Sequence, residues 1–236
     1  MRHLGRMAAP HWVALYGALL ASWAALWAAS APTGDGWARL LLDLCRATPE
    51  TAGAAGMLAM WLLMSAAMML PTAIPAIATH DEIAAAHGTG GGARLVAGYA
   101  VVWVGFSLAA AAAQSALGGV AQAPWLAPAL LALAGAYQLS PQKDACLSRC
   151  RSPLAFFITH WSEGPWRMGL RLGAVCLGCC WALMALGLVG GAMSLGFMAL
   201  ATLLMTLEKL TRGAFVPRAI GLACLVGAGY LTGGYL

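Results

Sequence analysis

Charged residues are scarce in this sequence: they make up only 9% of its 236 residues, whereas apolar residues make up 61%. A soluble domain carries about 25% charged residues, so the composition excludes an ordinary soluble globular protein. The apolar runs lack the alternating pattern of barrel strands, which leaves helices as the membrane-spanning elements that fit. We therefore predict an all-α protein, a polytopic transmembrane helix bundle in which residues 1–236 form a single domain.

Motifs for several kinds of chemistry are missing as well. The sequence has no GxxxxGK[ST] nucleotide-binding loop, no CxxCH haem motif and no paired CxxC motifs of the zinc-ribbon kind. No Ser/His/Asp arrangement or paired carboxylates stand out in the apolar runs, so we assign no catalytic residue and do not expect an enzyme. The runs also hold no carboxylate near their middle, which argues against a pump built on an intramembrane Asp or Glu relay.

The long apolar runs predict about seven membrane spans. These cover residues 11–29, 55–79, 95–118, 123–139, 169–190, 192–208 and 215–235. With this division, most basic residues fall on one side of the membrane, and only Arg39 and Arg46 fall on the other. The larger set is Arg2, Arg6, Arg94, Lys143, Arg149, Arg151, Arg167, Arg171, Lys209, Arg212 and Arg218. The positive-inside rule then puts the N-terminus in the cytoplasm and the C-terminus outside. The net charge of +5 is thus a topology signal and does not indicate nucleic-acid binding.

Three cysteines share one face of the fifth predicted span. In CLGCCW, residues 176–181, Cys176, Cys179 and Cys180 stand at i, i+3 and i+4, which places them within about 100° of arc on a helix. Met184 projects near the same side, one turn further on. Cysteine also packs well in apolar cores as a small hydrophobic residue, but three on one face favour a metal site.

A second pair of cysteines, Cys146 and Cys150, lies in the predicted cytoplasmic loop SPQKDACLSRCRSP, and His160 follows. One helical turn would bring the two thiols together. Six of the seven cysteines face the cytoplasm or the bilayer in this arrangement, where thiols stay reduced, so a disulfide framework is not expected. Soft thiolates select Cu(I), and they also suit Zn(II) and iron–sulfur chemistry.

Methionines form a stripe on the second predicted span. Met57, Met60, Met64 and Met68 fall within about 80° of arc on a helix, and Met69 lies off the stripe. Thioethers bind Cu(I) but hold Zn(II) poorly, so the stripe would pass a soft monovalent cation along the helix. The alternative is a flexible packing face.

Three polar residues are secondary candidates. His80 opens the predicted loop 80–94, where it would be either a hard-ligand exit site or a solvated side chain, and His160 follows the CxxxC pair. Glu208 adjoins Lys209 at the end of the sixth span. The pair would anchor the membrane boundary, or Glu208 would face inward and serve a site.

Three segments together resemble a known family. They are MWLLMSAAMMLP (60–71), SPQKDACLSRCRSPLAF (140–156) and CLGCCWALMALGLVGGAMSLGFMALATLLMTLEK (176–209). They resemble a bacterial family of predicted metal-binding integral membrane proteins of unknown function. The matching positions are Met64, Met68, Pro71, Cys146, Cys150, Cys176, Cys179, Cys180, Trp181, Glu208 and Lys209. The resemblance implies a multi-pass protein of the bacterial plasma (inner) membrane that binds a metal.

Three functions remain open at this point. The one that we favour is Cu(I) handling, either transport or delivery to a cuproenzyme, with the 146/150 pair as a cytoplasmic docking or relay site. The second is a membrane thiol/quinone oxidoreductase, and the third is an accessory subunit of a larger membrane complex. The expected partners are the lipid bilayer and a membrane protein or cuproenzyme that receives the ion, and an oligomer is compatible with the pattern.

Overall fold

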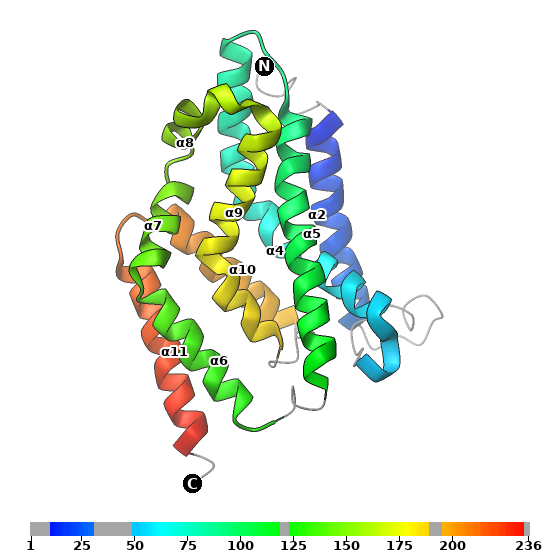
Figure 1. Cartoon of the computed structure of the whole chain (residues 1–236), viewed down its shortest axis with the longest axis vertical. Helices are drawn as coiled ribbons and strands as arrows, with labels where there is room; N and C mark the ends of the chain where they lie inside the picture. Colours follow the sequence, from blue (N-terminus) through cyan, green and yellow to red (C-terminus); the bar gives the residue numbers. More distant parts are fainter. Residues whose placement is uncertain (1–9, 31–48, 119–122, 189–194, 234–236) are drawn as a thin grey trace.

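The computed structural model describes residues 10–30, 49–118, 123–188 and 195–233 (Figure 1). Every element in these ranges is helical, which confirms the predicted all-α class. In chain order the α-helices are α2 (Pro10–Ser30), α4 (Pro49–Ala86), α5 (Gly92–Leu117), α6 (Leu126–Gln138), α7 (Pro141–Cys150), α8 (Pro153–His160), α9 (Gly164–Ala185), α10 (Leu195–Leu210) and α11 (Phe215–Gly233). Two short 3-10 helices, η2 (Trp161–Glu163) and η3 (Leu186–Leu188), flank α9.

Four helical segments in the described ranges are long and apolar enough to cross a membrane. They are Gly53–Ala86, Gly92–Leu117, Pro153–Leu188 and Phe215–Gly233. The predicted spans 123–139 and 192–208 correspond to α6, which has 13 residues, and α10, which has 16. Both are shorter than the roughly 20 residues that a span needs. The count of seven and the orientation of the termini stay predictions, because length and composition identify four candidate spans in the described ranges and do not show on which side of a membrane either terminus lies.

Two prolines interrupt the hydrogen bonding of α4, the helix that carries the methionine stripe. Pro71 has no N–H, so the carbonyl of Ala67 loses its usual partner inside the helix. The Trp23 indole N–H of α2 donates to that carbonyl at 3.0 Å. The side chain of α2 thus satisfies a backbone acceptor that would otherwise stay unpaired in an apolar interior, and it fixes α2 against α4.

Helices α5 and α9 approach each other closely at two glycines. A Cβ atom on Gly98 would overlap the carbonyl of Trp166, and one on Gly169 would overlap the carbonyl of Leu95. Small residues at a helix crossing allow this kind of backbone contact. The crossing fixes α9, and with it the three cysteines further along that helix, against α5 (Figure 1).

Residues 140–168, predicted as a cytoplasmic loop, are folded into α7, α8, η2 and the start of α9. Ser140 caps the start of α7, because its side chain accepts a bond from the Lys143 backbone N–H at 3.2 Å. Pro141 at the first helical position suits the same start. Helix α7 then packs against α9 (Figure 1). The prediction of a loop missed these helices because residues 140–168 include many polar residues, and the prediction relied on long apolar runs.

Candidate metal centre

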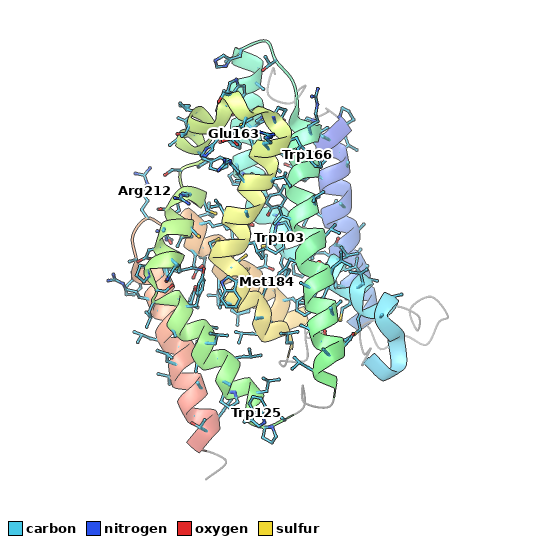
Figure 2. All side chains as sticks on the ribbon, in the orientation of Figure 1. Trp103, Trp125, Glu163, Trp166, Met184 and Arg212 are labelled. Carbon is cyan, nitrogen blue, oxygen red and sulfur yellow. The ribbon has the colours of Figure 1, made fainter. Side chains whose placement is uncertain are left out.

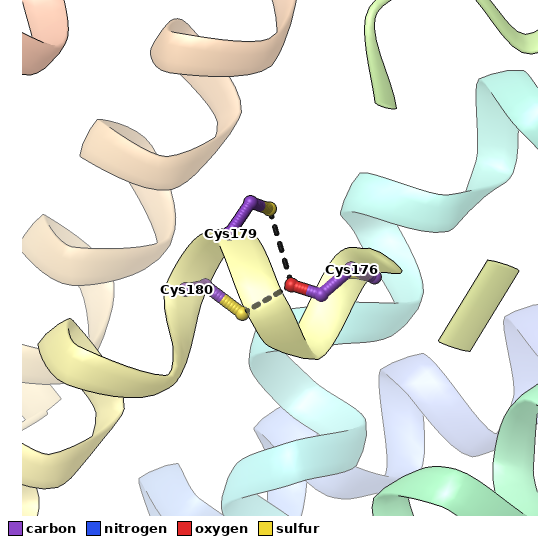
Figure 3. A group of neighbouring side chains, drawn as sticks. All are labelled: Cys176, Cys179 and Cys180. Carbon is purple, nitrogen blue, oxygen red and sulfur yellow. Dashed lines mark hydrogen bonds between the residues drawn. The ribbon is translucent and has the colours of Figure 1, made fainter. Parts of the chain in front are cut away.

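The three cysteines of α9 point into the interior of the bundle. Cys176, Cys179 and Cys180 are 1–3% exposed, and their sulfur atoms all lie within 4.8 Å of one another. The thiols of Cys179 and Cys180 both donate to the backbone carbonyl of Cys176, at 3.1 and 3.0 Å (Figure 3). The three side chains thus share one buried face, as their spacing predicts.

A fourth thiol, from helix α7, lies against this face of α9. The Cys150 Sγ atom lies 3.7 Å from the Cys179 Sγ atom. Cys146, one turn earlier on α7, lies against Gly178 of α9, where an added Cβ would meet its sulfur at 2.8 Å. The sequence predicted the 146/150 pair as a separate cytoplasmic site, whereas the structure places Cys150 in contact with the cysteines of α9. We call Cys150, Cys176, Cys179 and Cys180 the thiol cluster.

The two α7 thiols hold their protons more firmly than free cysteines do. Hydrogen bonds with Cys176 and Cys179, followed by burial, raise the pKa of Cys150 well above its usual value. Burial, followed by the charge of Cys179, raises the pKa of Cys146. A metal ion that binds Cys150 must therefore displace its proton.

Groups from two other helices touch the thiol cluster directly. The Cys180 thiol lies 3.6 Å from the Met69 Sδ atom of α4. The Tyr99 hydroxyl of α5 lies 3.3 Å from the Cys176 Sγ atom, and it donates to the Met69 carbonyl at 3.2 Å. Met69 is the methionine that helical phase placed off the predicted stripe, so the stripe prediction missed a thioether that contacts the thiol cluster.

A lysine supplies positive charge to the same sulfur. The Lys209 ammonium of α10 donates to the Cys176 Sγ atom at 3.1 Å and to the Thr72 hydroxyl of α4 at 2.7 Å. An ammonium at this distance stabilises a thiolate. Cys176 is therefore the cysteine whose surroundings favour the form that binds metals.

A buried ion pair between α7 and α10 lies next to the thiol cluster, at the backbone of Cys179. The Lys143 ammonium of α7 lies 2.7 Å from the Glu208 carboxylate of α10, and the two side chains are 0% and 2% exposed. Lys143 also donates to the Cys179 carbonyl, and the Gln138 amide donates to the other oxygen of Glu208. The interpretation of Glu208 as a boundary anchor is wrong, because its carboxylate points inward and binds these groups.

The remaining predicted residues lie elsewhere. Met184 follows the cysteines on α9 and is 1% exposed (Figure 2). The α4 stripe, Met57, Met60, Met64 and Met68, is buried in the same core. His160 bonds the Phe156 carbonyl through Nδ1 at 2.8 Å, which is a contact within α8.

His80 does not lie in a loop. Helix α4 continues through it to Ala86, and its ring is only 1% exposed. The ring packs between Phe157 and Trp161, with centroid distances of 5.4 and 5.6 Å, and Nδ1 lies 3.2 Å from the Asp81 carboxylate. The prediction of a solvated side chain is therefore wrong, because His80 is buried among aromatic side chains beside Asp81.

The sulfur separations suit a single soft metal ion. Bonds from a thiolate to a d10 ion such as Zn(II) are about 2.3 Å long, so two sulfurs on one ion lie about 3.8 Å apart in a tetrahedral site and about 4.6 Å apart in a linear one. The Cys150–Cys179 distance is 3.7 Å, and the α9 sulfurs lie within 4.8 Å. The donors are all thiols, with a thioether beside them, which is the set that Cu(I) prefers.

Comparison with known proteins gives a match to a protein family. A family model described as copper chaperone, PpoB2, matches residues 58–231. No curated protein and no solved structure matches the chain. The matched range includes the thiol cluster, Met69, Tyr99 and the Lys143–Glu208 pair, and it covers well over half of the 236 residues. The chain therefore belongs to the PpoB2 family of copper chaperones.

Proposed function

We propose that the protein binds Cu(I) at the thiol cluster and passes it to a copper protein, as a multi-pass, single-domain protein of the bacterial plasma (inner) membrane. The seven spans, with the N-terminus in the cytoplasm, are part of this proposal. The observation that carries it is the meeting of Cys150 and Cys179 across two helices, with sulfurs 3.7 Å apart in an apolar interior. The family match supports copper as the ion.

The ligand set favours Cu(I) over Zn(II). Structural Zn(II) sites are held by thiolates and imidazoles, and thioethers bind Zn(II) poorly. Here the Met69 thioether lies 3.6 Å from Cys180, and the group found for a metal in the described ranges consists of cysteines alone.

The position of Cys150 suggests how the ion leaves. Cys150 belongs to the ten-residue helix α7, which lies outside the four long apolar segments, whereas the other three thiols belong to α9 inside one of them. Cys150 is therefore the thiol through which a partner would exchange ligands with the bound ion. Removal of Cys150 weakens capture and transfer, while the α9 thiols still hold some copper.

A pair of variants tests this assignment. Under anaerobic conditions, we expect Cys150→Ser to lower the Cu(I) affinity of the purified protein by about 10-fold or more, because one ligand is lost. Cys146→Ser is the matched control, since Cys146 belongs to the same helix but packs against Gly178. We expect its affinity to stay close to that of the wild type. Competition with a chromophoric Cu(I) chelator measures both, and equal affinities for the two variants would refute the role of Cys150.

The short Cys150–Cys179 distance also favours a second candidate function, a membrane thiol oxidoreductase. Two thiols at 3.7 Å are close enough to form a disulfide after a small movement. In that function, two thiols give two electrons and two protons to a quinone, which becomes a quinol. Mass spectrometry of the protein from cell membranes distinguishes the two functions. A Cys150–Cys179 disulfide that disappears on quinone depletion favours the oxidoreductase, and two free thiols under both conditions favour copper handling.

A further inference from the structure

A polar pocket lies between α7, α8 and α9, three helices that are neighbours in Figure 1. Its volume is about 690 Å³, and pockets that hold small molecules have volumes of about 300–1,000 Å³. The polar side chains that line it are Ser148, Arg149, Ser152, Thr159, His160 and Arg171. None of these six belongs to the thiol cluster, so the pocket is separate from the metal centre.

The pocket adjoins the thiol cluster on both helices that supply thiols. On α7, Arg149 lines the pocket next to Cys150, and on α9, Val175 lines it next to Cys176. Cys150 is partly exposed, whereas the three α9 thiols are 1–3% exposed. A molecule in the pocket would therefore lie near the thiol of the cluster that is easiest to reach.

Two arginines give the pocket its positive charge. The side chains of Arg149 and Arg171 are exposed, and a guanidinium binds a carboxylate through two parallel N–H bonds. The Arg171 Nε atom donates to Glu163 at 2.6 Å, which leaves the two terminal nitrogens of that guanidinium as donors for a ligand. Arg149 forms no ion pair within the described residues. The pocket thus suits a ligand with carboxylates.

The hydroxyl and imidazole groups of the pocket offer hydrogen-bond acceptors. The Ser148 and Thr159 hydroxyls donate to carbonyls of their own helices at 2.9 and 2.8 Å, so their lone pairs stay available. His160 bonds the Phe156 carbonyl through Nδ1, and because a carbonyl only accepts, the neutral ring carries its lone pair on Nε2. The ligand that fits therefore combines carboxylates with amide or ammonium N–H groups, as a small peptide does.

We propose that this pocket binds a small peptide thiol with free carboxylates, and that the thiol cluster takes Cu(I) from that thiol. We call the pocket lined by the six polar residues the carrier pocket. The inference rests on the proposed function, because an ion that prefers thiolates travels through a reduced cytoplasm bound to a thiol such as glutathione. In the exchange, Cys150 gives up its proton and binds the ion, while the carrier thiolate leaves and takes up the proton. No group is oxidised or reduced.

Binding of S-methylglutathione to the copper-free protein in detergent tests the carrier pocket. This probe keeps the carboxylates and amides of glutathione, but its methylated sulfur forms no thiolate. We expect the wild type to bind it, and the double variant Arg149→Gln/Arg171→Gln to bind it about 10-fold more weakly or worse, because charge-assisted bonds are lost. Arg167→Gln is the matched control. Arg167 is exposed and lies one turn before Arg171 on α9, but it does not line the pocket, so its affinity should stay. Isothermal titration calorimetry measures all three proteins.

The rate of Cu(I) transfer from Cu(I)–glutathione tests the link between the carrier pocket and the thiol cluster. We expect transfer to the double arginine variant to be slower by about 10-fold or more, because the charges that guide the carrier are lost. Its equilibrium Cu(I) affinity, measured with a chromophoric chelator, should equal that of the wild type, since all four thiols remain. Equal transfer rates in the two proteins would overturn the role of the pocket in delivery.

The two measurements separate this inference from the proposed function. A wild type that binds S-methylglutathione through Arg149 and Arg171 but binds no Cu(I) would overturn the proposed function, together with the exchange step, and leave the peptide site standing. A wild type that does not bind the probe, or binds it no better than the double arginine variant, would overturn the carrier pocket. Binding of phosphatidylethanolamine through the same arginines, without binding of the probe, would also overturn it and assign the pocket to a lipid headgroup.

Discussion

Replacement of Cys176, Cys179 and Cys180 together by serine is expected to abolish tight Cu(I) binding. These three sulfurs lie within 4.8 Å of one another and are almost fully buried, so their loss removes most of the ligands at once. Loss of an outer-shell partner alone costs about 10- to 100-fold in metal affinity, and the loss of three direct ligands must exceed that range. We expect copper to fall from about one ion per chain to the background, as measured by elemental analysis of protein purified anaerobically.

A fourth buried cysteine provides the control for this prediction. Cys224 on α11 is 9% exposed, and the structure does not place it in the metal-binding group. Cys224→Ser makes the same chemical change in a similarly apolar place, and we expect it to retain its copper. Serine in place of Cys176 can still accept the bond from Lys209, so the triple variant should fold. Equal copper in the triple variant and the wild type would contradict the assignment.

Removal of one partner of the Lys143–Glu208 pair is expected to have the largest effect on stability. The two side chains are 0% and 2% exposed and lie 2.7 Å apart. An uncompensated charge in such a place destabilises a protein by about 3–5 kcal/mol. We therefore expect Glu208→Gln or Lys143→Met to lower the free energy of unfolding by this amount, as measured by denaturant titration in mixed micelles. The double variant should lose clearly less than the sum of the two single losses.

An exposed ion pair in the same chain gives the comparison. Arg171 and Glu163 lie 2.6 Å apart, but their side chains are 56% and 24% exposed. Solvent screens such a pair, which contributes about 0–1 kcal/mol. Glu163→Gln should therefore leave the unfolding midpoint almost unchanged. If Glu208→Gln is as mild as Glu163→Gln, the buried pair does not hold α7 and α10 together.

Local spacing predicted the parts of the site that one helix supplies. Cys176, Cys179 and Cys180 share a face because the helical repeat requires it, and the sequence alone shows that repeat. The segment around Cys146 and Cys150 also forms the helix that their spacing allows. The all-α class follows from composition in the same way.

Contacts between helices could not be predicted in this way. The approach of Cys150 to Cys179 depends on how α7 packs against α9, and spacing along the chain holds no information about that. Met69 lies off the methionine stripe of α4, so spacing along α4 does not mark it as a ligand. The thiol that it contacts belongs to a different helix, α9. Lys143 and Glu208 resemble interfacial charges in the sequence, and their burial is explained by their contact with each other and with Gln138 and the Cys179 carbonyl.

X-ray absorption spectroscopy of the Cu(I)-loaded protein tests the central claim most directly. The thiol cluster predicts two or three sulfur ligands at about 2.2–2.3 Å from copper, the usual length for a thiolate bond to a d10 ion. It also predicts that this signal disappears in the Cys176/Cys179/Cys180 serine variant and persists in Cys224→Ser. A spectrum dominated by nitrogen or oxygen ligands, or one that is the same in both variants, would contradict a copper site at the thiol cluster.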